Sequence, residues 1–419
     1  MGKNNRNKTP YIREVERVEL DEKRIKPRAV FAVIFLAIAV WMITYGVISL
    51  LSTEPGWREI EASAELEGNC GPEIIFQYNI GASGVSAGTE YRKITELYNE
   101  AVVKATKIFY NRYFYDVNNL YTLNQSPNSE QLIEPELYSA LKLLSDFGRR
   151  EMYFAPYYAE YNSLFFCVDD SEAYNFDPAI NPEMSAYFAA VQEFVTDESH
   201  VNLEFLGENR VILRVSDAYL AFAEENYITS FVDLYWMKNA FIVDYLADTL
   251  ERNGYTFGSL SSFDGFVRNL DEVSGAVYAY NIFDREESVI YPAAQMNYTG
   301  KISLCSFRNY AMVDLDVQFY YEYENGEIRH RYIGSDGYPV SANDSLVTYS
   351  SEKSCAEVMA ESLSVYLTDD FDEDALKLLH EDGVSYVYCD DFKLYSDGDS
   401  VNFSELFNNG GIKYTLCEE

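Results

Sequence analysis

The sequence is poor in the residues that build soft-metal and nucleic-acid sites. Its 419 residues include three histidines and six cysteines, and no two cysteines form a CxxC pair. Little material is therefore present for a zinc site or an iron–sulfur cluster. Lysine and arginine total 32 against 68 aspartate and glutamate residues, which gives a formal net charge of −36. A net negative charge repels the phosphate backbone of nucleic acids, so nucleic-acid binding is not expected.

One segment has no charge at all. Residues 29–51 form an apolar run of 23 residues, AVFAVIFLAIAVWMITYGVISLL, which is long enough to cross a bilayer as a helix. Basic residues precede it, so the positive-inside rule predicts a cytoplasmic N-terminus. A cleavable signal peptide is the alternative, because residues 62–64 (Ala-Ser-Ala) have the look of a cleavage site, but they lie too far beyond the run. The sequence predicts a single-pass protein of the cell membrane with an extracytoplasmic C-terminal domain.

The remaining chain shows no internal repeat and no Pro- or Ser-rich linker. We therefore expect a cytosolic basic tail at 1–28, the transmembrane helix at 29–51, a stalk and first strand region at 52–89, and one globular domain at 90–419. An apolar content of 48% is ample for a buried core. The even cysteine count permits disulfides outside the cell, but spacing alone predicts no particular pairing.

Helical and strand-like patterns alternate irregularly, which predicts an α+β fold. The expected helices begin near Thr89 and at Pro135, Pro182, Lys238, Ser354 and Asp372. The expected strands are residues 200–205, 210–215, 276–281, 312–323, 328–332, 345–349, 384–389 and 412–417. Asn325-Gly326 is a signal for a type I′ hairpin turn between two of these strands.

Two carboxylates on the helix after Ser354 have alternative explanations. Glu357 completes a capping box with Ser354, and Glu361 lies one turn further on the same face. The pair is either a site for Mg²⁺ or Ca²⁺ or a helix cap with a solvated glutamate. Residues 370–381 carry acidic side chains at EF-hand spacing, but Ala375 stands where that loop needs glycine, so an acidic helix N-terminus is the better interpretation.

The order of several motifs resembles the FAD:protein FMN transferases, the ApbE family. The matching segments are residues 119–124 (NLYTLN), 135–137 (PEL), 154–156 (FAP), 233–244 (DLYWMKNAFIVD), Asp264, 330–339 (HRYIGSDGYP) and 356–363 (AEVMAESL). In the family these positions correspond to S-E-L-S-R-L-N, P-E-L, F-D-P, D-L-G-G-I-A-K-G-Y-A-V-D, the aspartate of a G-G-D turn, H-I-I-D-P-K-T-G-Y-P and A-D-A-L-S-T-A-L. The resemblance implies a two-lobed mixed fold over residues 90 to 400.

The resemblance also implies an activity and a site. Family members transfer FMN from FAD to a Ser or Thr hydroxyl of an acceptor protein, with Mg²⁺ on the pyrophosphate. By this resemblance Glu357 and Glu361 would be metal ligands and His330 the catalytic residue. The implied cofactor-binding residues are Tyr235, Trp236, Lys238, Asp264 and Gly337. The implied partners are FAD, Mg²⁺ and an extracytoplasmic acceptor protein.

A second hypothesis keeps this fold without its chemistry. Tyr235 and Trp236 occupy the glycine pair of the family pattern, and Phe263 occupies a glycine before Asp264. Large rings there would fill a phosphate cleft and leave a binding or interaction module. A third possibility, a calcium-dependent adhesion domain, depends on acidity alone. The first two hypotheses require that Asp264, His330, Glu357 and Glu361 converge on one pocket.

Overall fold

The computed structural model describes residues 30, 34–36, 38–42, 53–63, 65–286, 289–312, 314–334, 337–398, 401–406, 408–409 and 412–418. The chain divides into two compact units, residues 1–54 and 55–419. In the first unit the described residues are helical between 30 and 42. No helix among the described residues combines the length and apolarity that a bilayer span requires. Most of the predicted transmembrane segment 29–51 lies outside the described residues, so the anchor stays a prediction.

The second unit is built on a nine-stranded sheet, hereafter the main sheet. Its strand order is β1-β2-β6-β7-β10-β13-β14-β15-β19. Neighbours are antiparallel except β15 and β19, which run parallel. The bounds are β1 Gly56–Glu59, β2 Ile74–Ile80, β6 Gly258–Ser262, β7 Phe266–Asn269, β10 Ile302–Arg308, β13 Ser345–Ser350, β14 Ser385–Asp390, β15 Lys393–Ser396 and β19 Thr415–Glu418.

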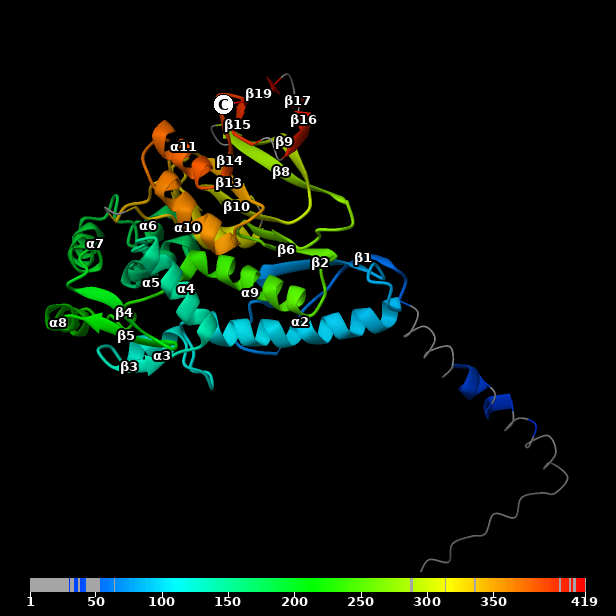
Figure 1. The fold of residues 1–419 in the computed structure, drawn as a ribbon. Helices are drawn as coiled ribbons and strands as arrows, with labels where there is room; N and C mark the ends of the chain where they lie inside the picture. Colours follow the sequence, from blue (N-terminus) through cyan, green and yellow to red (C-terminus); the bar gives the residue numbers. More distant parts are fainter. Residues whose placement is uncertain are drawn as a thin grey trace, which may run out of the picture. The chain divides into compact units, whose positions relative to one another are not determined.

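Helices cover one face of the main sheet (Figure 1). α9 (Lys238–Arg252) packs on β6 and β7, and α10 (Cys355–Tyr366) packs on β10 and β13. α2 (Ala87–Phe109) lies against α9, and α11 (Glu373–Glu381) against α10 and β14. α2 places its apolar stripe at Ile94, Tyr98, Ala101, Ala105 and Ile108, all buried, as the sequence predicts.

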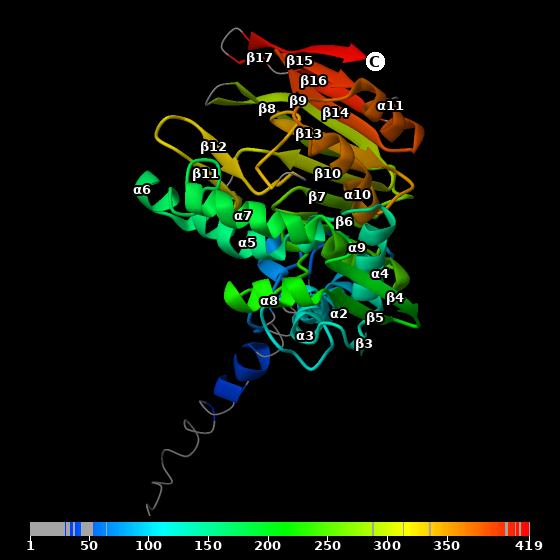
Figure 2. The same cartoon turned by 90° about the vertical axis from the view of Figure 1, so that its left-hand side faces the viewer.

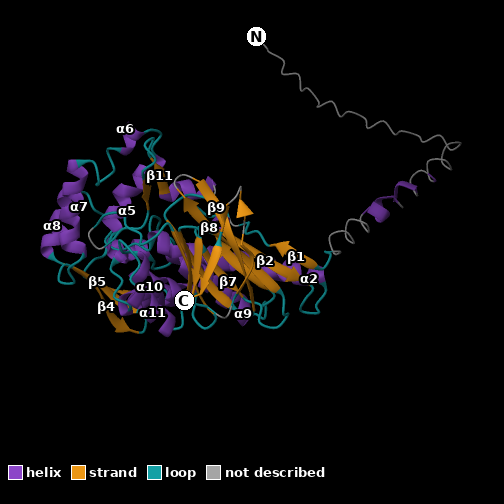
Figure 3. Cartoon of the chain, turned by 90° about the horizontal axis from the view of Figure 1, so that it is seen from above, coloured by secondary structure: helices purple, strands orange, loops and turns teal. Residues whose placement is uncertain are grey.

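The helices between α2 and α9 form a second lobe around a small sheet of order β3-β5-β4. Figures 2 and 3 show this lobe beside the strand-rich lobe. Its elements are α3 Leu120–Gln125, β3 Glu130–Leu132, α4 Pro135–Asp146, η3 Glu151–Tyr153, α5 Ala155–Tyr161, η4 Asn162–Phe166, α6 Asp170–Ala173, α7 Pro182–Val195, β4 Val201–Gly207, β5 Arg210–Val215, α8 Asp217–Glu225 and η5 Tyr235–Met237. The fold is therefore mixed α+β with two lobes.

Smaller sheets complete the unit. The long hairpin β8–β9 pairs with β16, β11 pairs with β12, and β17 pairs with β18. The bounds are η2 Gly71–Glu73, β8 Val277–Glu286, β9 Val289–Thr299, η6 Asp314–Phe319, β11 Tyr320–Glu322, β12 Ile328–His330, β16 Asn402–Leu406, β17 Asn408–Asn409 and β18 Ile412–Lys413.

Three expectations from the sequence differ from the structure. The predicted strand 312–323 begins with the 3₁₀ helix η6, and only Tyr320–Glu322 is a strand. The hairpin exists, but its loop spans 323–327 and Asn325 does not have the positive φ of a type I′ turn. Residues 55–89 belong to the compact unit, because β2 is an internal strand of the main sheet, so the globular domain starts before residue 90.

Candidate functional site

A cavity of about 190 Å³, hereafter the central cavity, lies where the start of α9, the β6–β7 turn, the end of α2 and η6 meet. Tyr235, Lys238 and Asp264, which the motif resemblance selects from distant parts of the sequence, all line it. The full lining is Glu73, Phe109, Tyr110, Asn111, Arg112, Asn162, Phe166, Asp233, Tyr235, Lys238, Asn239, Asp264, Gln318 and Phe319. The cavity therefore brings together residues that lie up to 246 positions apart in the sequence (319 minus 73).

Tyr235 forms one aromatic wall of the central cavity. Its φ is +37°, in the left-handed region that favours glycine, and its amide donates to Oδ1 of Asp233 at 2.9 Å. Its ring stacks on Tyr158 and its hydroxyl donates to Oδ1 of Asn162 at 2.7 Å. Tyr235 thus keeps a backbone conformation suited to the glycine that the family pattern has at this position, while its ring fills space.

Lys238 and Arg112 supply positive charge to the central cavity. Nζ of Lys238 pairs with Oε2 of Glu73 at 3.1 Å and lies 5.8 Å from the ring centre of Tyr110. Burial is the largest single influence on Lys238 and opposes its charged form, but Glu73, Cys70 and Asp264 together outweigh it, so the pKa of Lys238 is raised. Arg112 is exposed and has no ion-pair partner within the described part of the chain. Arg112 is therefore the cation most available to an anionic ligand.

Asp264 is a buried carboxylate paired with a buried arginine. Oδ2 of Asp264 lies 3.5 Å from Nη1 of Arg331, and Nη2 of Arg331 donates to the Asp264 carbonyl at 3.0 Å. Burial raises the pKa of Asp264 despite the opposing charge of Arg331. The Arg331 guanidinium also lies over the ring of Phe319, 4.3 Å from its centre. Arg331 was not selected from the sequence, although it directly follows His330.

Four buried polar atoms at this site lack hydrogen-bond partners among the described residues. They are Nε and Nη1 of Arg331, Oδ1 of Asn239 and Oδ1 of Asp264. Buried polar atoms are rarely left unpaired, so each marks a place where a ligand group or a water molecule would bind. Asn239 lines the central cavity and Arg331 contacts its wall residue Phe319.

His330 lies next to the central cavity and does not line it. It pairs with Tyr320 across the β11–β12 ladder and is buried, and its Nδ1 has no hydrogen-bond partner in the described structure. Burial, with the charges of Arg329 and Arg331, lowers the pKa of His330 to about 3. The imidazole is therefore neutral at physiological pH and is a weak base. The next residue in the chain, Arg331, contacts Asp264 and Phe319 at the cavity.

Trp236 and Gly337 belong to the core around the site. The Trp236 ring is buried and packs edge-on against Tyr332 at 5.1 Å. Gly337 has φ +83°, and a Cβ there would lie 2.0 Å from the hydroxyl of Tyr157. Neither residue lines the central cavity. These positions do not support the expected contact with a cofactor. Core packing accounts for Trp236, and the close approach to Tyr157 accounts for Gly337.

Glu357 and Glu361 have partners of their own on α10. Oε2 of Glu357 accepts from the Ser354 amide at 2.9 Å and completes the capping box, and Nζ of Lys353 holds both oxygens of Glu361 at 2.5 and 2.6 Å. Among the described residues no group of three or more His, Cys, Asp or Glu side chains is arranged to hold a metal ion. The structure does not bring these carboxylates into the central cavity, and His330 does not line it either. The expected convergence of Asp264, His330, Glu357 and Glu361 on one pocket is therefore not found, because only Asp264 lines the central cavity.

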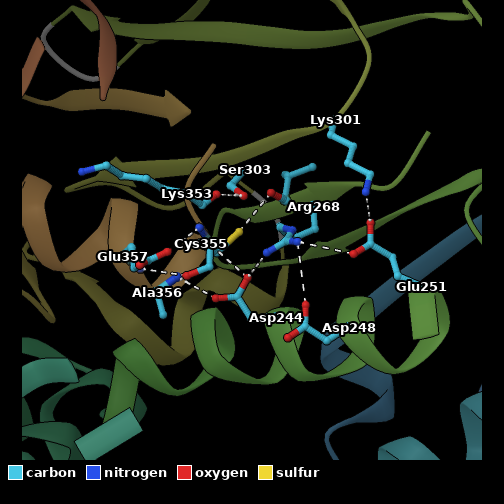
Figure 4. A network of polar contacts seen from close by, with 12 residues as sticks. Asp244, Asp248, Glu251, Arg268, Lys301, Ser303, Lys353, Cys355, Ala356 and Glu357 are labelled. Atoms are coloured by element: carbon cyan, nitrogen blue, oxygen red, sulfur yellow. Dashed lines mark hydrogen bonds and ion pairs between the residues drawn. The ribbon is translucent and has the colours of Figure 1, made fainter. Parts of the chain in front are cut away.

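The start of α10 is instead part of an ion-pair network (Figure 4). Asp244 of α9 accepts hydrogen bonds from the amides of Cys355 and Ala356 at 2.9 and 2.8 Å, and it pairs with Arg268 at 2.9 Å. Burial nevertheless raises the pKa of Asp244. Asp244 therefore caps α10 from outside and ties it to α9 and β7. Asp244, the last residue of the motif at 233–244, thus has a structural role.

A larger cavity, about 560 Å³, lies between α2, α4 and α9. Its charged lining is Glu136, Asp244, Asp248, Glu251 and Arg252. Four carboxylates against one arginine disfavour a pyrophosphate, so size alone does not make this cavity the nucleotide site.

The fold described above is similar to that of solved structures. The chain is similar to the ApbE protein of Thermotoga maritima, with a TM-score of 0.53, 14% identity, and coverage of 83% of this chain and 97% of that one. It is also similar to the flavin transferase ApbE of Vibrio cholerae, with a TM-score of 0.51, 14% identity, and coverage of 81% and 94%. The chain has the fold of the ApbE flavin transferases, as the motif resemblance predicts. No protein-family model and no curated protein matches the sequence.

Proposed function

We propose that residues 55–419 form an FAD-binding domain of the FAD:protein FMN transferase type, with the nucleotide at the central cavity. The observation that carries the proposal is the meeting of Tyr235, Lys238 and Asp264 in one cavity of an ApbE-type fold. These residues were selected by their motifs, and convergence of distant residues is not expected for chance matches.

The lining assigns roles to individual side chains. Arg112 and Lys238 would bind the pyrophosphate oxygens, because they are the cations that line the cavity. The rings of Tyr235 and Phe319 provide an apolar wall of the cavity and meet edge-on at 5.9 Å. The Asn239 amide oxygen, which lacks a partner within the described structure, would accept a hydrogen bond from the ligand.

The chemistry would be transfer of a phosphoryl group. An acceptor hydroxyl forms a bond to the FMN phosphorus, the bond from that phosphorus to the bridging pyrophosphate oxygen breaks, and AMP leaves as the hydroxyl loses its proton. Positioning the pyrophosphate beside Arg112 and Lys238 would stabilise the charge on the leaving group. His330, the residue that the resemblance implies as catalytic, does not line the cavity, and its burial and its pKa of about 3 disfavour a role as proton acceptor.

The two residues expected to bind Mg²⁺ already have other partners. Lys353 neutralises Glu361, and one Glu357 oxygen is used by the Ser354 amide. Mg²⁺ binding there would require both carboxylates to exchange partners and to give up an ion pair. We therefore derive no step through a metal at these two residues.

A second candidate is a binding module that has the fold without transfer. Specific observations favour it: the Glu361–Lys353 pair, the burial of His330, and the rings of Tyr235 and Trp236 at the glycine positions of the family pattern. In this case the central cavity would bind a flavin nucleotide or a smaller ligand without turnover.

One experiment separates the two candidates. The full-length protein in detergent is titrated with FAD by calorimetry, and is then incubated with FAD, Mg²⁺ and a Ser/Thr acceptor protein. Flavin fluorescence on the acceptor that survives denaturation supports the transferase. Binding of FAD without covalent product supports the binding module. No heat on FAD addition and no product would contradict both.

The location of the domain is a separate proposal, supported by the uncharged run at 29–51 and the basic residues before it. The N-terminus would be cytoplasmic, and residues 55–419 extracytoplasmic, where an acceptor protein would meet the site. Protease treatment of intact cells tests it: loss of the C-terminal domain is expected, and its full protection would contradict the topology.

A further inference from the structure

Two further cavities adjoin the central cavity on the side of the second lobe. The side cavity, of about 290 Å³, shares four lining residues with the central cavity, among them Arg112 and Tyr235. The outer cavity, of about 470 Å³, shares Tyr121 and Gln125 with the side cavity. Arg112 and Gln125 are exposed, so these cavities open to solvent along the segment that joins α2 to α3.

The surface around these openings carries almost no charge. Three stretches contribute to the lining of the cavities, namely residues 109–129, 161–168 and 226–232. These 36 residues contain one basic side chain, Arg112, and one acidic side chain, Asp116. At the average of the chain, 68 acidic residues in 419, about six acidic side chains would be expected (36 times 68/419). The exposed residues of the three stretches are hereafter called the neutral face. Acidic residues directly flank the stretches: Glu130, Glu160, Asp169, Glu225 and Asp233.

The neutral face also exposes large apolar side chains. Val168 and Tyr227 are each 90% exposed, more than any other large apolar side chain among the described residues, and Phe114 and Phe166 are exposed as well. Phe166 lines the central cavity and Phe114 the outer cavity. Single exposed apolar residues are common on protein surfaces, but several of them around one set of openings indicate an interaction surface.

We infer that the neutral face is the docking surface for the acceptor protein and that it binds an uncharged segment around the acceptor's Ser or Thr. This inference rests on the proposed function, because transfer requires the acceptor hydroxyl to approach Arg112 and Lys238 at the central cavity. The acceptor chain must therefore cross the surface at which the cavities open. A charged segment would lose hydration there without meeting opposite charges, whereas an uncharged segment would not.

The lining of the outer cavity suits a polypeptide backbone. Its only charged member is Glu130, which already pairs with Arg210 at 3.1 Å. Amide and hydroxyl groups both donate and accept hydrogen bonds, as the peptide groups of an extended segment require. The amide and hydroxyl side chains that line this cavity are Asn118, Tyr121, Thr122, Gln125, Ser126, Ser129 and Gln131.

A display library tests the chemistry of the partner and the place of binding together. Random 12-residue peptides with a fixed central Thr are selected on the full-length protein in detergent with saturating FAD. The salt concentration is about 0.15 M, which screens the long-range attraction of basic peptides to the acidic protein. Val168→Glu and Tyr227→Glu each place a charge on the neutral face. Leu378→Glu is the matched control, because Leu378 is an exposed apolar residue of α11 outside the face.

We expect charged residues in the selected peptides at no more than a third of their frequency in the library. Val168→Glu and Tyr227→Glu should capture the selected pool at least tenfold less well than wild type, and Leu378→Glu should capture it equally. FAD affinity, measured by calorimetry, should be the same in wild type and all three variants, since none of these residues lines the central cavity.

Several results would overturn the docking surface while FAD binding leaves the proposed function standing. They are no enrichment of any peptide, enrichment of charged peptides, and equal capture by wild type, Val168→Glu and Tyr227→Glu. A wild-type dimer that Tyr227→Glu converts to a monomer in light scattering would also overturn it, because the face would then join two copies of the chain. Absence of FAD binding by the wild type would overturn the proposed function itself.

Discussion

The central cavity and the start of α10 were both selected by sequence motifs, and they differ in how their polar groups are paired. At the central cavity, Arg112 has no ion-pair partner within the described chain, and Asn239 and Arg331 retain unpaired polar atoms. At α10 the predicted metal ligands are occupied: Glu357 caps the helix and Glu361 binds Lys353. Unpaired polar groups support the proposed binding site at the central cavity, whereas the paired carboxylates at the start of α10 have a structural role.

The comparison shows which kind of motif carries functional information. Glu357 and Glu361 are four residues apart on one helix, a spacing that a capping box and a local ion pair explain fully. Tyr235 and Asp264 are 29 positions apart (264 minus 235), and no local rule explains why they face the same cavity. Convergence of distant residues is therefore the stronger evidence for a site.

The largest expected effect concerns the buried ion pair at the central cavity. Arg331→Met leaves Asp264 buried without its charged partner, which should cost about 3–5 kcal/mol of unfolding free energy. Urea unfolding of the full-length protein measures this. Arg210→Met is the control, since Arg210 pairs with Glu130 at the surface and its loss should cost at most about 1 kcal/mol. Similar losses in the two variants would show that the Asp264–Arg331 pair is not isolated from solvent.

A smaller loss is expected at Gly337. Gly337→Ala would place a Cβ 2.0 Å from the Tyr157 hydroxyl at a positive φ, so steric and backbone costs add to about 3 kcal/mol. Gly148→Ala has φ +66° and nothing within 4 Å of the new Cβ, so only the backbone cost of about 1 kcal/mol applies. Thermal denaturation compares the two. If the variants lose the same stability, the close approach of Gly337 to Tyr157 is not present in solution.

The pH dependence of stability probes the burial of His330. Its pKa is about 3 in the folded state and about 6.5 when unfolded, so the unfolded chain binds more protons between these values. The contribution of His330 to the free energy of unfolding is therefore full above pH 6.5. It decreases as the pH falls toward 3, by at most about 1.4 kcal/mol per pH unit. His330→Phe should flatten this part of the urea-midpoint profile. An unchanged profile for His330→Phe would show that the His330 side chain is exposed to solvent in the folded protein.

The smallest effect is expected at α10. Glu357→Ala removes half of the capping box and should cost about 1 kcal/mol. If Glu357 acts only as a cap, Glu357→Ala should leave FAD affinity and its Mg²⁺ dependence as in wild type. A loss of Mg²⁺-dependent FAD binding in a folded variant would restore the metal-ligand role and remove the contrast between the two regions.

Elements with clear local signals were predicted well from the sequence. α7 and α9 have the predicted bounds, because each combines an apolar stripe with a terminal signal such as Asn181, Pro182 or Gly254. The central strand β10 was missed because every residue in it is buried, which removes the alternation that identifies a strand. η6 was mistaken for a strand because the composition around it, with Val317 and Phe319, favours strands.

The lining of the central cavity was predicted in part for similar reasons. The motifs identified Tyr235, Lys238 and Asp264, which line the cavity, while their roles in binding stay a prediction. Arg112 and Arg331 were missed as residues of the site, since no local sequence pattern distinguishes an arginine beside a cavity from any other arginine. Their positions depend on the packing of the two lobes and the hairpin, which only the tertiary structure supplies.

The claim that the central cavity binds the pyrophosphate of a flavin nucleotide is tested most directly by one titration. FAD is added to the full-length protein and to Lys238→Met, with Lys353→Met as a matched control on α10. We predict that wild type and Lys353→Met bind FAD with equal affinity and that Lys238→Met binds at least tenfold more weakly. Equal affinity of Lys238→Met and wild type, or a loss confined to Lys353→Met, would contradict the account and move the site to α10.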